Sequence, residues 1–206
     1  MDKGHKKSIY SLDELNPEIR RRIEAAVLDI FSEVDFHRAN MRTVAKKAGV
    51  SFSSIYKYYG NKEKLLFTCI DNCLSELNER MIDHLQGIEN LKEKMRKAFW
   101  VQLDFYERNP KVGRIIFLTI PYKKWMADKT FNQNKMINVF LDVARQGQNE
   151  GILKADMRAG VLLDFMLGLV HRCFTMWIFR GQKEGLSGNA NVLFEMLWKA
   201  ISNSEQ

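Results

Sequence analysis

The chain has 206 residues, 46% hydrophobic and 28% charged, which suits one globular domain or a small domain followed by a larger one. The formal net charge is +7, and residues 36–62 hold six basic side chains and no Asp or Glu: Arg38, Arg42, Lys46, Lys47, Lys57 and Lys62. Little positive charge remains for the rest of the chain, so the excess is local. Such a cluster is typical of a phosphate-binding surface, although a solvated basic face has the same composition.

Several classes of protein are disfavoured. Apolar runs stay shorter than the roughly 18 residues of a bilayer span, and the basic start MDKGHKKSIY lacks the apolar stretch of a signal peptide. Cys69, Cys73 and Cys173 form no disulfide pattern, which predicts a reducing cytoplasm. Cys69 and Cys73 are four residues apart and could act as a thiol sensor, but free cysteines are usually small buried hydrophobes. The four histidines are scattered, and catalytic motifs are missing, so we expect no metal, no cofactor and no catalytic residues.

Three short helices are predicted near the start of the chain, after a flexible basic arm at residues 1–16. Asn16 and Pro17 begin a helix that ends near residue 34 and carries one apolar stripe. Asn40 caps a second helix at 41–48, which Gly49 ends, and Ser51 caps a third at 52–58. Two short helices joined by a glycine-centred turn form a helix-turn-helix.

The rest of the chain keeps a helical period, with Pro110 and Pro121 as natural boundaries. Helices are predicted at residues 62–84, 91–109, 112–120, 130–148, 156–179 and 190–201. The helix at 156–179 is apolar on almost every side, so we expect neighbours on more than one side of it. The predicted fold class is therefore all-α.

Residues 19–66 contain four characteristic segments: Phe31, Ser32 and Glu33 before the turn, VAKKAGVS at 44–51, IYKYY at 55–59 and NKEKLL at 61–66. With this spacing they resemble the signature of the TetR family. The resemblance implies a bacterial transcription regulator with an N-terminal three-helix DNA-binding domain at 17–62. A helical effector-binding and dimerisation domain would follow at 63–206.

The positions within this motif predict a set of DNA contacts. A recognition helix places its N-terminal side chains against base edges, while neighbouring groups hold phosphates. Tyr56 resembles the family's phosphate-contacting tyrosine, and Lys62 is expected to meet a phosphate at the start of its helix. Phe52 stands where the family usually has a polar residue, so it either contacts a thymine methyl or packs on the protein. Ser53 stands where glycine is common. The complete predicted set is Asn40, Arg42, Phe52, Ser53, Ser54, Tyr56, Lys57, Tyr58 and Lys62.

Two further sites are expected in the second domain. Aromatic residues concentrate between positions 99 and 179 and predict a ligand pocket within a packed helical core. Its predicted residues are Trp100, Phe117, Phe140, Phe174 and Trp177, with His171 or Arg114 as the polar anchor. A two-fold homodimer is predicted to form through the helix around Val161 to Phe179 and the last helix. In the last helix, apolar residues at helical spacing form the expected interface: Leu193, Phe194, Leu197, Trp198 and Ile201.

Together these features predict a cytoplasmic repressor that leaves a near-palindromic operator when a small, largely apolar ligand binds. Double-stranded DNA, that ligand and a second copy of the chain are its expected partners, and a membrane is not. One alternative is a DNA-binding factor controlled by a partner protein, without a small-molecule effector. The other is an enzyme that uses the helical cavity.

Overall fold

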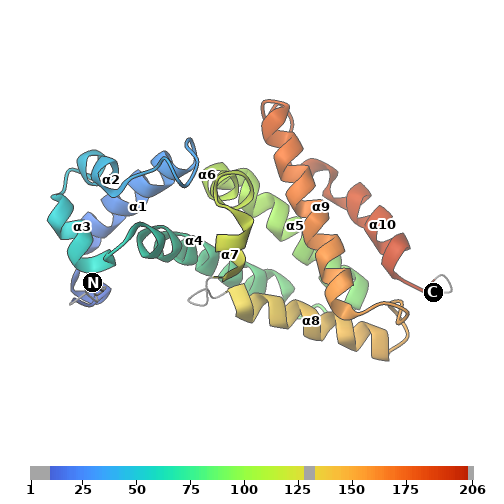
Figure 1. Cartoon of the computed structure of the whole chain (residues 1–206). Coiled ribbons are helices and arrows are strands. Elements are labelled where there is room, and N and C mark those ends of the chain that lie inside the picture. Colours follow the sequence, from blue (N-terminus) through green and yellow to red (C-terminus); the bar gives the residue numbers. More distant parts are fainter. Residues whose placement is uncertain (1–9, 128–132, 204–206) are drawn as a thin grey trace. The chain divides into compact units, whose positions relative to one another are not determined.

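The computed structural model describes residues 10–127 and 133–203, and within these ranges the chain is helical without β-strands. This confirms the all-α prediction. The chain divides into two compact units (Figure 1). The first comprises Met1–Cys73 and Lys111–Phe131, and the second Leu74–Pro110 and Asn132–Gln206.

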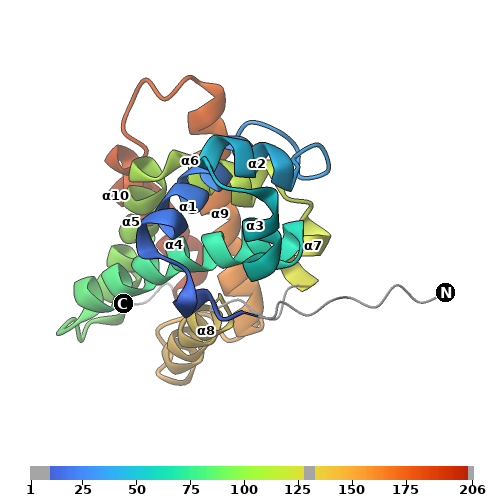
Figure 2. The same ribbon diagram turned by 90° about the vertical axis from the view of Figure 1, so that its left-hand side faces the viewer.

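The first unit begins with η1 (Leu12–Glu14), a 3-10 turn, and α1 (Pro17–Phe31). It continues through α2 (Met41–Ala48), α3 (Phe52–Tyr59) and the first part of α4 (Lys62–Leu85). Figure 2 looks onto α1, α2 and α3, where α2 packs against both other helices. Their contact surfaces form the core of the unit, which includes the fully buried Ile23, Val27, Phe31, Val44, Ile55 and Tyr59.

A later segment of the chain also belongs to the first unit. It contains most of α6 (Pro110–Arg114), then η2 (Ile115–Thr119), which has π-helical geometry, and α7 (Tyr122–Ala127). The Thr119 hydroxyl donates to the carbonyl of Phe31 at 2.8 Å, and the Phe36 amide donates to the carbonyl of Thr119 at 3.1 Å. These bonds fix the segment to the end of α1.

The second unit contains the remainder of α4 together with α5 (Leu91–Arg108), α8 (Gln133–Asn149), α9 (Ala159–Phe179), η3 (Ser187–Asn189) and α10 (Ala190–Ile201). The central helix α5 packs against α9 and α10, and α8 packs against α9. The interior is largely aromatic and aliphatic, with Phe99, Leu103, Phe105, Phe174 and Phe194 completely buried.

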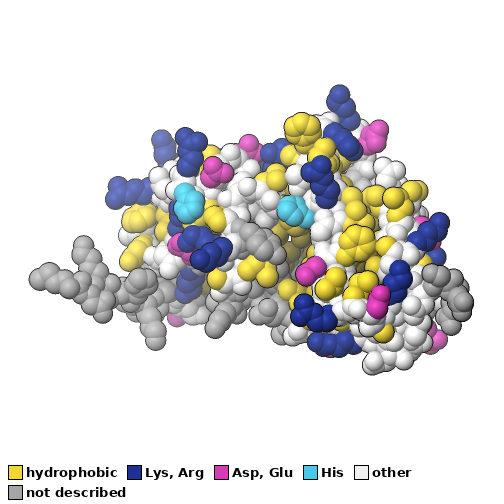
Figure 3. Space-filling view, turned by 45° about the vertical axis from the view of Figure 1, so that its right-hand side comes forward, with side chains coloured by type: hydrophobic (Ala, Val, Ile, Leu, Met, Phe, Trp, Pro, Cys, Tyr) yellow, Lys and Arg dark blue, Asp and Glu magenta, His cyan; other side chains and the backbone are white. Residues whose placement is uncertain are grey.

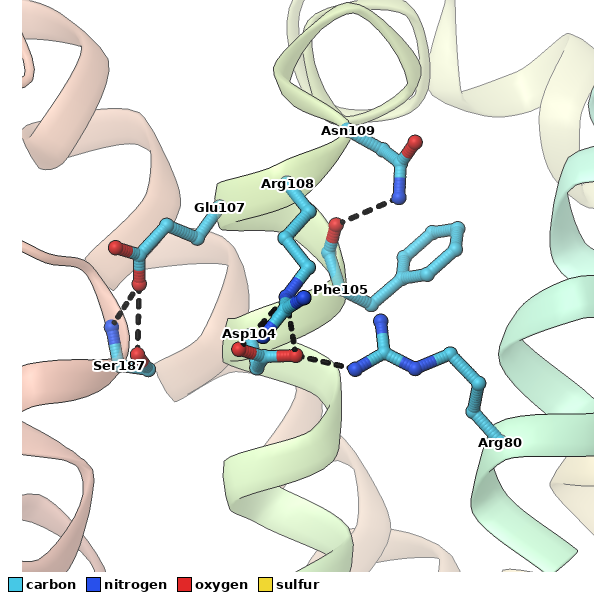
Figure 4. Close-up of polar contacts among 7 residues, drawn as sticks. All are labelled: Arg80, Asp104, Phe105, Glu107, Arg108, Asn109 and Ser187. Atoms are coloured by element: carbon cyan, nitrogen blue, oxygen red, sulfur yellow. Dashed lines mark hydrogen bonds and ion pairs between the residues drawn. The ribbon is translucent and has the colours of Figure 1, made fainter. Parts of the chain in front are cut away.

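Polar contacts also hold the second unit together (Figure 4). The buried Asp104 carboxylate accepts from the guanidinium groups of Arg80, on α4, and Arg108, one turn along α5. Glu107 accepts from the backbone N–H of Ser187 at 2.8 Å and from its hydroxyl at 2.7 Å. The loop between α9 and α10 is therefore tied to α5.

Several boundaries differ from the sequence predictions. The helix expected at 112–120 is α6 followed by the π-helical η2, and α7 was not predicted. The first helix ends at Phe31 rather than near residue 34, and α9 begins at Ala159 rather than near 156. The expected domain boundary at 62/63 also differs from the division between the compact units, because the start of α4 and residues 111–127 pack with the helix-turn-helix. Part of the predicted flexible arm, residues 10–16, is folded onto the first unit, and residues 1–9 lie outside the described ranges.

α9 is apolar, as predicted, and it is also long enough to span a bilayer, which was not predicted. By length and composition it is the one helix in the described part of the chain that is able to cross a bilayer, although only 28% of its apolar window is buried inside the protomer. It packs against α5 and α8 in the second unit. An uncovered apolar side on a helix is typical of a surface that contacts another molecule.

Candidate functional site

The turn of the helix-turn-helix is built by three local devices. The Asn40 side chain caps α2 by accepting from the amides of Arg42 and Thr43 at 2.9 and 3.0 Å. Gly49 ends the helix with a φ of +64°, a conformation that favours glycine. On α1, the Arg22 guanidinium donates to the carbonyls of Ala48 and Gly49 and leaves no room for a side chain at Gly49. These contacts fix the angle at which α3 leaves the turn.

The recognition helix α3 presents a polar and aromatic face to solvent. Ser51 caps it by accepting from the Ser54 amide at 3.0 Å, while Ile55 and Tyr59 anchor its other side in the core. Of the predicted DNA contacts, the exposed ones are Asn40, Arg42, Phe52, Ser53, Tyr56 and Lys57, and the half-buried ones are Ser54, Tyr58 and Lys62. The structure therefore brings the predicted α3 residues to one accessible surface.

Phe52 packs on the protein while part of its ring stays accessible. The Arg42 guanidinium carbon lies 5.4 Å from the Phe52 ring centroid, and the Tyr56 ring lies 6.1 Å from it. Phe52 is 40% exposed and Tyr56 44% exposed. This stack holds the Arg42 cation, in the first turn of α2, against the outer face of α3. Phe52 thus contacts other side chains of the protein, while its predicted contact with a thymine methyl stays a prediction.

Lys62 has a different role from the predicted phosphate contact. Its ammonium donates to the carbonyls of Phe36, Ala39 and His37 at 2.7, 3.0 and 3.4 Å, and it lies 4.4 Å from the Phe36 ring centroid. The cation therefore closes the loop between α1 and α2, and its phosphate contact stays a prediction. Asn40 is likewise used as a cap, because its carbonyl oxygen already accepts two backbone amides.

The basic charge of this region is only partly neutralised. Asp29 on α1 pairs with Lys47 at 2.9 Å and with Lys111 at 2.5 Å, and these two ammonium groups lower the pKa of the Asp29 carboxyl. Among the described residues, Arg42 and Lys46 form no ion pair within 4 Å. A net positive surface remains around α2 and α3.

The predicted ligand residues do not line one cavity. Arg114 and Phe117 belong to the first unit and the other five to the second. Phe174 is buried in the core and His171 is exposed. The Trp177 indole donates to the Glu184 carbonyl at 2.6 Å, which is a structural role. The Trp100 ring is half-buried and packs between His84 and Lys97.

The second unit contains an apolar pocket formed by α4, α5 and α8, with about 590 Å³ of empty space including its open side. Of the predicted residues, Phe140 lines it. Two polar side chains, Asn78 and Lys94, also line it, and the buried Asn78 Oδ1 has no hydrogen-bond partner. The remaining lining residues are aliphatic or Met: Met81, Ile82, Leu85, Met95, Ala98, Val139 and Val143. The aromatic residues of the sequence do not point to this set. Asn78, a polar residue among the apolar residues of α4, is the sequence feature that could have indicated the pocket.

The pocket can accept an apolar chain and also offers two groups for a polar end. Unpaired buried oxygens are uncommon in proteins, so the Asn78 carbonyl is a candidate acceptor for a ligand donor. The Lys94 ammonium is a candidate partner for an anionic group.

Other kinds of site find little support. In the described ranges, groups of three or more His, Cys, Asp or Glu able to hold a metal ion are absent. Cys69 is buried, and burial raises the pKa of its thiol, which disfavours the reactive thiolate.

The predicted dimer residues mostly belong to the core of the protomer itself. Phe194, Leu197, Trp198 and Ile201 are buried against the chain's own helices, and Leu193 is half-buried. The exposed apolar residues of α10 are Val192 and Met196 instead, and those of α9 are Val161, Phe165 and Phe179. Figure 3 shows hydrophobic side chains exposed over the second unit. The uncovered surface of α10 is therefore the side opposite to the predicted one.

Known proteins share both the motif and the fold. Residues 23–69 match the family described as "Bacterial regulatory proteins, tetR family". A fatty acid metabolism regulator protein of Bacillus subtilis is 22% identical over 93% of this chain and 100% of its own length. The fatty acid degradation regulator of Bacillus halodurans superposes with a TM-score of 0.77 at 17% identity, covering 90% of this chain and 96% of the other. The B. subtilis regulator FadR in complex with stearoyl-CoA superposes with a TM-score of 0.73 at 20% identity, covering 88% of this chain and 98% of the other. From the motif, the domain match and these relatives together, the chain belongs to the TetR family of transcription regulators.

Proposed function

We propose that this protein is a cytoplasmic, dimeric repressor that binds a near-palindromic operator and leaves it when a fatty acyl ligand enters the pocket of the second unit. The observation that carries the proposal is the pairing of an exposed, basic helix-turn-helix with an apolar pocket formed by α4, α5 and α8. The matched relatives are regulators, which removes the enzyme alternative.

The DNA-binding part of the proposal rests on α3. Its N-terminal residues enter the major groove, where Ser53 and Ser54 hydroxyls and the Lys57 ammonium meet base edges. The exposed Tyr56 hydroxyl donates to a phosphate. Arg42 approaches the DNA from the start of α2, held in place by the Phe52 ring.

The dimer rests on the exposed faces of α9 and α10. Val161, Phe165 and Phe179 recur at helical spacing on one side of α9, with Gly168 between them. A Cβ at Gly168 would meet no other atom of the protomer, so the protomer itself does not require glycine there. The missing side chain would instead let the helix of a second copy pack closely at this position. A two-fold dimer matches a near-palindromic operator, whose half-sites lie about one DNA turn, roughly 34 Å, apart.

The ligand is inferred from the chemistry of the pocket and from the relatives. One relative is named a fatty acid metabolism regulator, and a solved neighbour is in complex with stearoyl-CoA. The aliphatic and Met walls of this pocket suit an alkyl chain, and Lys94 supplies a cation for an acidic or phosphate-bearing head. Release then requires that the ligand bind more tightly to the conformation that does not fit DNA.

The test begins with an operator selected from random duplexes by the full-length protein. Anisotropy of that duplex should fall when stearoyl-CoA is added, and coenzyme A alone should have no effect. Lys94→Glu should weaken the response to stearoyl-CoA while ligand-free DNA binding stays unchanged. Lys183→Glu changes the same charge at an exposed position in the α9–α10 loop and should respond like the wild type.

Two results would change the conclusion. DNA binding without any response to acyl ligands would favour the alternative of control by a partner protein. Failure to select any duplex would refute the proposed role as a regulator.

The dimer is tested by sedimentation. Phe165→Glu should yield monomers with weaker operator binding, whereas Val34→Glu, at an exposed apolar position of the first unit, should remain dimeric. Removing α10 is unsuitable as a test, since Phe194 and Leu197 fill the protomer core.

A further inference from the structure

Two amide side chains of the second unit have hydrogen-bonding groups that the proposed ligand does not use. Asn78 lines the pocket from α4, and its carbonyl oxygen is buried. Gln102 on α5 is only 2% exposed. Among the described residues, neither Oδ1 of Asn78 nor Nε2 of Gln102 has a hydrogen-bond partner. An unpaired acceptor and an unpaired donor are both costly to bury, so both atoms are candidates for bonds to a ligand.

The contacts between α4 and α5 fix the relative direction of these helices. Arg80 on α4 pairs with Asp104 on α5 (Figure 4). Four residues further along α4, the His84 ring lies 5.8 Å from the ring of Trp100, which is four residues earlier on α5. The two helices therefore run antiparallel, and the α4 residues before Arg80 lie beside the later turns of α5.

This direction places the two amides toward the same end of the pocket. On α5, the last residue that lines the pocket is Ala98, and Gln102 follows one turn later on the same face. Asn78 is the first of the α4 residues that line it. Lys94 marks the opposite end, roughly 12 Å from Gln102 along the helix at about 1.5 Å per residue. The apolar walls thus lie between a cation and two unpaired amide groups.

A hydroxyl is a small ligand group that satisfies both amides at once. Its O–H donates to the carbonyl oxygen of Asn78, while its oxygen accepts from the amide N–H of Gln102. A plain alkyl chain in the same place would leave both groups unpaired against hydrocarbon. Sites that bond a ligand hydroxyl discriminate strongly against analogues that lack it.

We propose that the pocket is selective for hydroxylated fatty acyl ligands, whose acidic head lies at Lys94 and whose hydroxyl lies between Asn78 and Gln102. This inference rests on the proposed acyl-responsive function and narrows its ligand class. In this arrangement the two amides determine specificity. The aliphatic walls contribute equally to the affinity of hydroxylated and plain chains.

The experiment compares decanoic acid with ω-hydroxydecanoic acid, two acids of about the required length, by isothermal titration of the full-length protein. The hydroxy acid should bind about tenfold more tightly, because the plain acid leaves buried amides unpaired. Asn78→Leu should remove this preference by weakening the hydroxy acid and strengthening the plain one, and Gln102→Met should reduce it in the same way. Asn149→Leu, at an exposed position at the end of α8, is the control and should keep the wild-type ratio.

Thermal melting checks that each variant is folded, and the wild-type comparison depends on no variant. Equal affinities of the wild type for the two acids would overturn the inference. Weaker stearoyl-CoA binding by Asn78→Leu would also overturn it, because the amide would then bind the coenzyme arm. In either case, operator release by stearoyl-CoA would leave the proposed function intact. Failure of every acyl ligand to release the operator would instead refute the proposed acyl response.

Discussion

Replacing Lys62 by Met tests whether this cation belongs to the protein's own fold or to its DNA contact. The Met side chain keeps the aliphatic stem but removes the ammonium that closes the loop between α1 and α2. A hydrogen bond from a charged group contributes about 1.5–3 kcal/mol. Because the two shorter bonds are partly buried and water replaces some of their energy, we expect a loss of about 2–3 kcal/mol. This corresponds to a decrease in Tm of roughly 4–12 °C for a protein of this size.

Calorimetry and salt-dependent DNA binding distinguish the two roles. With Lys62→Met, the Tm should fall and DNA affinity should weaken, while the slope of log K against log salt stays the same. Lys64→Met is the control, since Lys64 is an exposed lysine on the same helix, and its Tm should change little. A Lys62→Met protein with an unchanged Tm and a slope smaller by about 0.9 would refute the structural role and support the predicted phosphate contact instead.

Three other substitutions test separate contacts. Gly49→Ala should cost about 1–2 kcal/mol more in urea unfolding than Gly87→Ala, because both glycines have positive φ but only Gly49 lacks space for a Cβ. Asp104→Asn should destabilise the protein by about 3 kcal/mol in the same assay, since it removes the buried carboxylate that pairs with the partly buried Arg80 guanidinium and with the more exposed Arg108. The lowered pKa of Asp29 means that this carboxylate stabilises the fold above about pH 4 and loses that effect as pH falls through its folded pKa. Lys111→Met should raise the pKa of Asp29 in an NMR titration and move acid unfolding to higher pH, and an unchanged titration would contradict the ion pair.

The helix-turn-helix was predictable because its signals are local. Asn40, Gly49 and Ser51 each act within four residues of their own position, so their sequence order specifies the caps and the turn. The loop contact of Lys62 was not predicted because its partners are carbonyls more than twenty residues away, and backbone acceptors leave no trace in residue types.

The ligand pocket was harder to predict for a related reason. Its walls come from α4, α5 and α8, and their relative rotation decides which apolar residues face an opening and which fill the core. Helical spacing alone made Phe174 and Phe140 equivalent candidates, yet Phe174 is completely buried and Phe140 lines the pocket. The same ambiguity placed Phe194 and Trp198 on a dimer surface, whereas both pack inside the protomer.

The discontinuous first unit restricts how this regulator can be recombined with others. A chimera that joins residues 1–73 to a foreign sensor domain would lack Thr119 and Lys111, and with them the bonds to Phe31, Phe36 and Asp29. A transplant that preserves these bonds has to carry residues 111–127 as well, which requires several junctions instead of one. Exchange of a sensor by a single crossover would therefore leave the DNA reader incomplete, so new ligand responses are more accessible through substitutions within the pocket.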